Sequence, residues 1–159
     1  MIALAFWAQW PDEALPDGIR ADRLVVLKGR RQLVLYAGGQ AVKTYRVSLG
    51  RHPAGPKQSE GDGRTPEGLY SIALRKEHTC CFRSLQISYP NTADRAWASA
   101  HRVSPGGLIM VHGISNRFGW VGRLHRLYDW TDGCVAVTNR EMAELWRVVP
   151  DGTPIELRP

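Results

Sequence analysis

Short alternating apolar runs, separated by turn residues, fill the first half of the chain and predict β-strands. Within "ADRLVVLKGRRQLVLYAGGQAVKTYRVSLG" three such runs follow one another, and Gly38-Gly39 suits a tight hairpin between the second and third. Residues 51–68 are too rich in Gly and Pro for either kind of element and predict a loop. The runs "LYSIAL" and "FRSLQISY" then predict two further strands.

The second half mixes helix and strand signals. "NTADRAWASAHR" predicts a short helix, "GGLIMVHG" an apolar strand that ends in His112, residues 113–131 a loop, and "CVAV" another short strand. Thr138 and Glu141 have the spacing of a capping box. The apolar stripe that follows predicts a helix packed on the core, and it consists of Met142, Leu145, Trp146 and Val149. "PDGTPIEL" predicts a turn and a last strand.

Together these signals predict a mainly β (α+β) fold with one well-marked helix beneath the Cys134 strand. We expect one domain over residues 21–159. Residues 1–20 form an apolar N-terminal extension, which could be the remnant of an export segment although it lacks a basic region and a cleavage site. Its apolar run is too short to span a bilayer.

Composition places the chain among ordinary globular proteins, with 159 residues, 43% hydrophobic and 23% charged. The net charge of +6 favours an anionic partner, which could be nucleic acid, a membrane surface or a carboxylate-rich polymer. The 21 Lys and Arg residues are scattered and no nucleic-acid-binding motif is present, so a carboxylated substrate fits at least as well.

The cysteines point to chemistry at one position. Cys80 and Cys81 are adjacent, which rarely allows a disulfide between them, and we expect both to pack as small apolar side chains. We therefore expect Cys134 to form no disulfide and to have a free thiol. Cysteine attacks as the thiolate, and a histidine that titrates near neutrality is the usual base. If the strands of His112 and Cys134 are neighbours, the two side chains lie side by side at one rim.

The chain resembles the L,D-transpeptidase catalytic domain, or YkuD domain, over roughly residues 21–158. The likeness rests on "LVLYAGGQAVKTYRVSLG", "GDGRTPEGLYSI", "GGLIMVHG" and "TDGCVAVTN" in that order, the last two carrying the His-Gly and Ser/Thr-x-Gly-Cys motif. The resemblance implies a sandwich or barrel of short mixed strands. It further implies Cys134 as nucleophile, His112 as general base, the Gly113 carbonyl as the group that orients the imidazole, and the Gly133 and Cys134 amides as the oxyanion hole.

The same resemblance implies acyl transfer between peptidoglycan stem peptides in the periplasm or cell envelope, without metal or organic cofactor. Cys134 would attack a meso-diaminopimelate carbonyl of the donor stem, and an amine of the acceptor stem would take the acyl group. Carbapenem β-lactams would acylate the same thiol. The chain has Asp132 and Ala136 where many members have His and Arg, as in a branch of compact stand-alone domains, so we expect 3-3 or 1-3 (L-Ala to diaminopimelate) crosslinks.

Other residues near the motif are candidates for substrate binding. Arg117, Arg123 and Arg126 could clamp stem carboxylates, and Tyr128 and Trp130 could wall the site. His125 could assist proton transfer, and Asp132 could hold His125 or a substrate ammonium. Solvated arginines, packed aromatics and an ordinary loop histidine are the alternatives.

Three other functions remain open. A peptidoglycan carboxypeptidase or endopeptidase on the same scaffold would pass the acyl group to water. A metal-binding or structural module could use His112, His125, Asp132 and Cys134, although their spacing matches no zinc pattern. Nucleic-acid binding would rest on charge alone.

Overall fold

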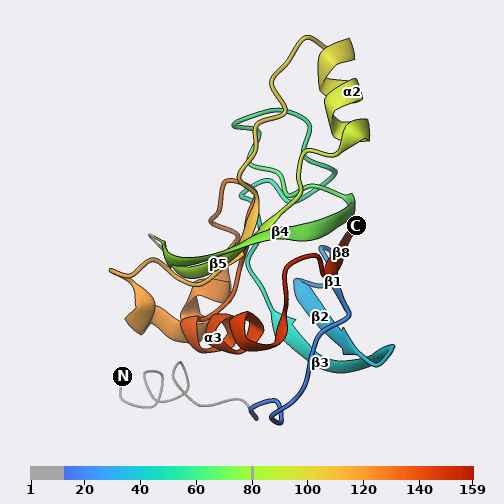
Figure 1. Ribbon diagram of the computed structural model, residues 1–159. Coiled ribbons are helices and arrows are strands. Elements are labelled where there is room, and N and C mark those ends of the chain that lie inside the picture. Colours follow the sequence, from blue (N-terminus) through green and yellow to red (C-terminus); the bar gives the residue numbers. More distant parts are fainter. Residues whose placement is uncertain (1–12, 80) are drawn as a thin grey trace.

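The computed structural model describes residues 13–79 and 81–159 and shows a curled eight-stranded sheet with few helices (Figure 1). The strand order is β3-β2-β1-β8-β4-β5-β6-β7. The strands are β1 (Arg23–Leu27), β2 (Gln32–Ala37), β3 (Gln40–Arg46), β4 (Gly68–Thr79), β5 (Phe82–Ile87), β6 (Met110–His112), β7 (Val135–Ala136) and β8 (Pro154–Arg158). This confirms the mainly β fold. Most of the predicted N-terminal extension, and Cys80, lie outside the described residues.

The sheet curls because one long strand serves two halves and the two edges meet. β4 pairs antiparallel with β8 through its first residues and with β5 through its later ones, with register shifts along the second pairing. After β3, the chain crosses to the opposite edge, where Ser48 bridges Ala136 and Gly50 bridges Thr131. Residues 131–136 therefore lie between β6 on one side and the chain after β3 on the other.

The hydrophobic core lies inside the curl and under α3 (Asn139–Val148). Both hydrogen bonds of the predicted capping box are present, Glu141 N–H to Thr138 Oγ1 at 3.3 Å and Thr138 N–H to Glu141 Oε2 at 2.8 Å. Three of the four predicted stripe residues are fully buried and Trp146 is partly buried. The fully buried core side chains include Leu24, Leu33, Leu35, Leu49, Leu85, Val111, Met142, Leu145 and Ile155.

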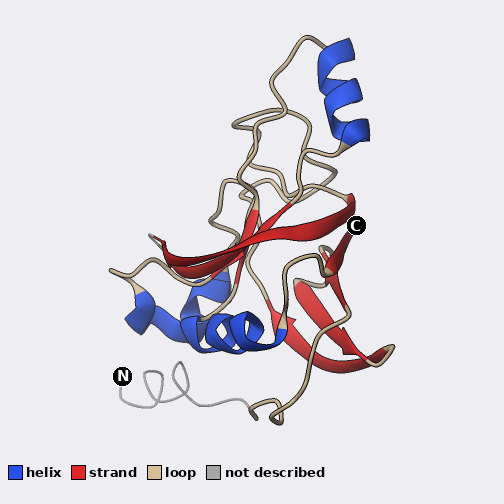
Figure 2. Cartoon of the chain, in the orientation of Figure 1, coloured by secondary structure: helices blue, strands red, loops and turns tan. Residues whose placement is uncertain are grey.

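The other helical segments lie outside this core. α2 (Thr92–Ala100) begins at an Asn91–Asp94 capping box, buries only Ala98, and stands beyond the long loops at the top of Figure 2. The predicted loop 113–131 instead contains η1 (Gly119–Leu127), two 3-10 turns joined at Gly122. Its residues read as a loop because Gly122 lies inside the segment, where the backbone leaves helical φ/ψ. No helix in the described ranges is long and apolar enough to cross a bilayer.

The predicted strand "GGLIMVHG" is shorter than expected. Gly106 and Leu108 have positive φ values of 73° and 54°, so the backbone cannot run straight until β6 begins at Met110. A left-handed leucine has no signal in a single sequence. The bend matters because it brings the Leu108 carbonyl close to Cys134, as described below.

Candidate active site

The pairing of β6 with β7 brings His112 and Cys134 to one face of the sheet. The two strands are parallel, with Val111 opposite Val135 and His112 opposite Ala136. Side chains alternate along a strand, so Cys134 points to the same face as Ala136 and His112. Two residues of rise and one strand spacing put the two Cα atoms roughly 8 Å apart. Val111 and Val135 point to the core on the other face.

The predicted closeness of the two side chains depends on how short β7 is. In a long parallel pair, the end of one strand and the start of its neighbour lie at opposite rims. Here β7 comprises only Val135 and Ala136. Cys134, the residue before β7, is therefore only two residues from Ala136, which lies opposite His112. This short parallel pair is compatible with the juxtaposition expected from the motif.

Gly133 shapes the turn before the nucleophile. Its φ is +130°, a conformation that L side chains rarely adopt, and a Cβ at this position would lie 2.5 Å from the Arg64 carbonyl oxygen. The loop between β3 and β4 thus packs directly onto the Gly133–Cys134 backbone. Only glycine fits both the backbone angle and the space.

Thr131 locks the same turn through its hydroxyl group. Thr131 Oγ1 accepts the Gly133 N–H at 3.1 Å and donates to the Cys134 carbonyl at 2.8 Å. The Gly133 amide, expected in the oxyanion hole, is therefore already hydrogen-bonded in this structure. This role was not predicted from the sequence, although Thr131 is the Ser/Thr of the Ser/Thr-x-Gly-Cys motif.

The Cys134 thiol is half-buried at the rim of the site. Its Sγ lies 3.7 Å from the Leu108 carbonyl oxygen, which can accept the weak S–H bond. Cys134 forms no disulfide with Cys81, the other cysteine that the structure describes. Cys81 is partly buried.

His112 is held ready to accept a proton. Its Nδ1 lies 2.6 Å from the Gly113 carbonyl oxygen, the hydrogen bond that the family resemblance implied. A carbonyl can only accept, so Nδ1 carries the hydrogen and Nε2 of the neutral ring keeps its lone pair. The side chain is 6% exposed. Burial lowers the pKa of His112, an effect that the hydrogen bond to Gly113 partly offsets, and the ring is therefore neutral at pH 7.

Trp130 lies against both His112 and His125. Its ring is edge-on to each, with centroid distances of 5.8 Å to His112 and 6.4 Å to His125, and its Nε1 donates to His125 Nδ1 at 3.4 Å. His125 is buried, and its carbonyl accepts from Ser48 Oγ at 3.0 Å. Burial lowers the pKa of His125 to about 3, helped by the Arg126 charge and by His112. His125 is thus a neutral group that fixes Trp130.

A pocket of about 630 Å³ opens beside this tryptophan. Its wall includes Phe118, His125, Tyr128 and Trp130, and it has the size of a small-ligand site. Tyr128 is 68% exposed, so it forms a rim, while Trp130 forms the inner wall next to His112. Tyr128 and Trp130 thus line a pocket whose lining includes neither His112 nor Cys134.

The charged candidates lie elsewhere than expected. Asp132 is 80% exposed and forms an ion pair with Arg51, a residue that belongs to none of the sequence motifs. It does not hold His125, whose ring contacts are Ser48 and Trp130. Arg51 therefore offsets the negative charge that Asp132 places beside Cys134.

The three arginines of the loop do not gather at the cleft. Arg117 is exposed, and Arg123 and Arg126 line a second pocket, with Arg126 bound to Glu141 at 2.5 Å. In the part of the chain that the structure describes, no group of three or more His, Cys, Asp and Glu side chains could hold a metal ion. The proposed metal-ligand set is dispersed because Asp132 points to solvent and His125 is buried behind Trp130.

Comparisons with known proteins identify relatives of this chain and of its fold. The chain is 28% identical over 130 residues to YafK of Escherichia coli K12, covering 78% of this chain and 45% of that protein. Its fold is similar to that of the helical cell shape determining protein Pgp2 from Campylobacter jejuni, with TM-score 0.66, 20% identity, and coverage of 99% and 54% of the two chains. It is also similar to L,D-transpeptidase 3 from Mycobacterium tuberculosis with a faropenem-derived adduct, with TM-score 0.60, 13% identity, and coverage of 87% and 60%.

The chain spans about half the length of YafK and of Pgp2. The two structural likenesses show the shared fold. The match that decides the family is to the L,D-transpeptidase catalytic domain (YkuD), and it covers residues 21–157, nearly all of the curled sheet and both His112 and Cys134. The chain belongs to the L,D-transpeptidase catalytic domain family.

Proposed function

We propose that this chain is a peptidoglycan L,D-transpeptidase that uses Cys134 as its nucleophile and His112 as its base. The observation that carries the proposal is the placement of both side chains on one face of the β6–β7 pair, with His112 neutral and its Nδ1 bound to Gly113. Family membership supplies the reaction class. The adduct on a related transpeptidase supports β-lactams as inhibitors.

In the first step, Cys134 Sγ attacks the carbonyl at the L-centre of meso-diaminopimelate in a donor tetrapeptide stem. His112 Nε2 takes the thiol proton as the C–S bond forms. The tetrahedral intermediate collapses when the C–N bond to the terminal D-Ala breaks, and His112 returns its proton to the leaving amine. The product is a thioester on Cys134 and free D-Ala.

In the second step, an amine of an acceptor stem attacks the thioester and His112 takes a proton from that amine. The C–S bond breaks, the proton returns to sulfur, and a new amide crosslinks the two stems. The thioester divides one difficult amide exchange into two easier steps. A pocket walled by Trp130 and Tyr128 lies beside the site and is large enough to hold part of a stem.

The oxyanion of each intermediate is assigned to the Gly133 and Cys134 amides. Because Gly133 N–H bonds Thr131 Oγ1 at 3.1 Å, this amide must share or exchange that bond when the oxyanion forms. The rotating hydroxyl of Thr131 keeps its second bond, to the Cys134 carbonyl, throughout. The turn would therefore stay in place while the amide changes partner.

A peptidoglycan substrate supports a location in the periplasm or cell envelope. Both 3-3 and 1-3 crosslinks remain within the proposal, since the ion pair with Arg51 offsets the charge of Asp132 that favoured an ammonium acceptor. Transfer of the same thioester to water would make the enzyme a carboxypeptidase or endopeptidase. An amine acceptor makes the enzyme a transpeptidase, and a water acceptor makes it a hydrolase.

The test is to incubate the purified chain with peptidoglycan and to identify the muropeptides by mass spectrometry. We expect dimers linked through diaminopimelate, absent from the Cys134→Ala variant. Stems shortened by one residue, without dimers, would show the hydrolase. Unchanged peptidoglycan with the wild-type chain, or dimers made by Cys134→Ala, would refute the proposal.

A further inference from the structure

The turn between β1 and β2, residues 28–31, begins and ends with a basic residue that bonds to a distant segment of the chain. Lys28 bonds to the loop between β3 and β4, which packs on the Gly133 backbone. Arg31 bonds to Asp129, the residue before Trp130. One short turn is therefore connected both to the segment that holds the nucleophile and to the segment that covers the base.

Lys28 is a buried cation whose ammonium group has three hydrogen-bond acceptors. Its Nζ donates to the Gly55 carbonyl at 2.6 Å, to the Thr65 carbonyl at 2.8 Å and to Glu67 Oε1 at 2.8 Å. The residue is 2% exposed, and a charge buried to this extent is stable only with such partners. Lys28 therefore ties both ends of residues 55–67 to the end of β1.

The loop that Lys28 holds packs directly on the backbone beside the nucleophile. The Arg64 carbonyl oxygen lies 2.5 Å from the position that a Cβ of Gly133 would take. Thr65 Oγ1 accepts the Gly50 N–H at 2.9 Å, and a Cβ at Gly50 would lie 3.1 Å from the Gly133 Cα. These are backbone contacts with no side chain between them to absorb a shift. A displacement of the loop therefore displaces the amides assigned to the oxyanion.

Arg31 reaches the other segment with all three nitrogens of its guanidinium group engaged. Nε and Nη2 bond the Asp129 carboxylate at 3.0 and 2.8 Å, and Nη1 donates to a carbonyl of the same turn at 2.7 Å. The Asp129 carboxylate also accepts the Leu49 N–H at 2.9 Å. Asp129 is thus fixed from two sides, one residue before the Trp130 ring that stands against His112.

The backbone at Arg31 indicates that its side chain does more than complete the turn. Its φ is 53°, in the left-handed region that favours glycine. Short hairpin loops often end in a residue of this conformation, and glycine is the usual choice there. An arginine at this position costs conformational energy, and the charge-assisted contact with Asp129 is what the side chain returns.

We infer that Lys28 and Arg31 are positioning residues of the proposed reaction. Lys28 holds the loop that sets the place of the Gly133 and Cys134 amides, and Arg31 holds Trp130 against the base. The inference rests on the proposed function, because it concerns the same nucleophile and base. A misplacement of about 1 Å at a reacting group can cost about a hundredfold in rate while the fold stays intact.

The pH dependence of acylation reports on the contact between Trp130 and His112. Burial lowers the pKa of His112, the Gly113 carbonyl partly offsets this, and the titratable neighbours are the neutral His125 and the Cys134 thiol. A looser Trp130 reduces the burial, so the pKa of His112 rises towards 6.5. The base is then protonated, and acylation slows, at a higher pH than in the wild-type chain.

Arg31→Gly separates a positioning role from a structural one. Glycine suits the left-handed φ, so the urea midpoint of unfolding should stay close to wild type although the ion pair is lost. The pH below which carbapenem acylation slows should nevertheless rise. In a Trp130→Ala background, Arg31→Gly should cause no further rise. A rise that persists there would be a direct effect of the unpaired Asp129 charge, and it would overturn the role of Arg31 through Trp130.

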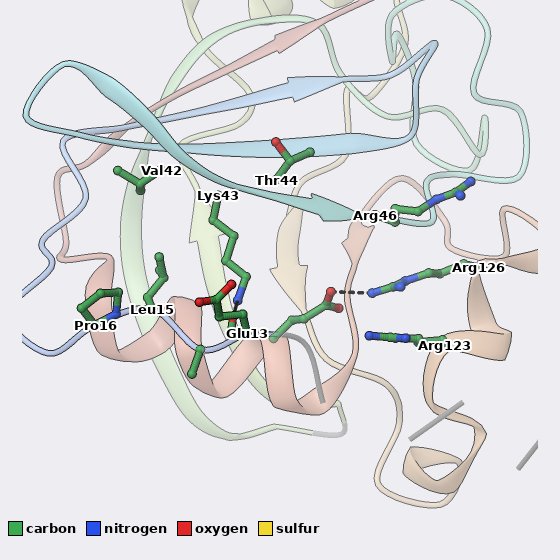
Figure 3. A pocket seen from close by; sticks show the side chains of 11 residues that line it. Glu13, Leu15, Pro16, Val42, Lys43, Thr44, Arg46, Arg123 and Arg126 are labelled. Atoms are coloured by element: carbon green, nitrogen blue, oxygen red, sulfur yellow. Dashed lines mark hydrogen bonds and ion pairs between the residues drawn. The ribbon is translucent and has the colours of Figure 1, made fainter. Parts of the chain in front are cut away.

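Lys28→Met keeps the length of the side chain and removes the ammonium group. We expect the rate of acylation at saturating carbapenem to fall roughly ten- to a hundredfold, with little change in the half-saturating concentration. The amide signals of Gly133 and Cys134 should shift in NMR spectra. The matched control is Lys43→Met, which removes another lysine–glutamate ion pair, at 2.6 Å, in the second pocket (Figure 3). The control should leave the rate and both signals as in the wild-type chain.

Glu67→Ala tests the same contact if Lys28→Met does not fold. It removes one of the three bonds from a side chain that is 19% exposed, so we expect smaller changes in the same direction. An unchanged acylation rate in the folded variant, or an equal loss in Lys43→Met, would overturn the role of Lys28.

Failure of the proposed function gives a different result. A wild-type chain that no carbapenem acylates contradicts the proposed function. In that case the amide signals of Gly133 and Cys134, and the pKa of His112 measured by NMR, still show whether the turn positions them. A wild-type chain that is acylated, with a rate and pH dependence that Lys28→Met and Arg31→Gly leave unchanged, contradicts only the positioning roles.

Discussion

The Trp130 ring stands edge-on against the His112 ring, with 5.8 Å between their centroids and 76° between their planes. This contact removes one side of the imidazole from water. The burial to which it contributes is the main cause of the lowered pKa of His112. Trp130 thus connects the shape of the pocket to the protonation state of the base.

Trp130→Ala should move the acid limb of the pH–rate profile to higher pH. Less burial lets the pKa of His112 rise towards its ordinary value near 6.5, so that more of the base is protonated at pH 6. The rate at pH 8 should also fall, by roughly ten- to a hundredfold, because the ring is no longer held in place. The measurement is the rate of acylation by a carbapenem between pH 5 and 8, with Tyr128→Ala as the control at the exposed rim. An unshifted acid limb would show that Trp130 does not control the base.

Thr131→Val should destabilise the turn before Cys134. The substitution keeps the shape of the side chain but removes the bonds to the Gly133 amide and the Cys134 carbonyl. We expect a loss of about 1–3 kcal/mol in the free energy of unfolding and a slower acylation of Cys134. Urea unfolding measures the first and intact-mass kinetics the second. Thr131→Ser, which keeps the hydroxyl, should stay close to wild type in both.

Gly133→Ala should be far more harmful than a comparable change at Gly152. Both glycines have positive φ, but a Cβ at Gly152 meets nothing within 4 Å, whereas one at Gly133 meets the Arg64 carbonyl. We expect Gly152→Ala to cost about 1 kcal/mol and to remain active. Gly133→Ala should lose both more stability and measurable acylation. Equal effects at the two positions would show that the close packing on Arg64 is unimportant.

The protein should lose stability as the pH falls below 6.5, in part through His125. Burial lowers the pKa of His125 to about 3, so between pH 3 and 6.5 the unfolded chain binds a proton that the folded chain does not. Each pH unit in that window can lower the free energy of unfolding by up to about 1.4 kcal/mol. His125→Gln should flatten the slope between pH 7 and 5 in urea titrations, with His112 still contributing its own part.

The parts of this structure that follow from local sequence were predictable, and the parts held by distant contacts were not. The capping box at Thr138 and the hairpin at Gly38-Gly39 depend on neighbours in the chain, and both are present. η1 contains Gly122 in its interior and is held by contacts such as the Arg126–Glu141 ion pair, so its residues read as a loop.

At the candidate active site, too, features set by local sequence were predictable and features set by distant contacts were not. The motif predicts Cys134 and His112 as site residues, and the short apolar runs beside them do form β7 and β6. It could not show that Arg51 pairs with Asp132, since the two are joined only when the chain after β3 crosses to the far edge of the sheet. The motif also could not show that Arg123 and Arg126 line the second pocket. The backbone leaves helical φ/ψ at Gly122, so helical spacing does not predict which way the side chains of η1 point.

The most direct test of the account is the intact mass of the protein after exposure to a carbapenem. The wild-type chain should gain the mass of one inhibitor, Cys134→Ala should gain none, and His112→Gln should react about 10²–10⁴-fold more slowly. An adduct that survives Cys134→Ala would place the reactive thiol at Cys80 or Cys81 and contradict the assignment of Cys134 as the nucleophile.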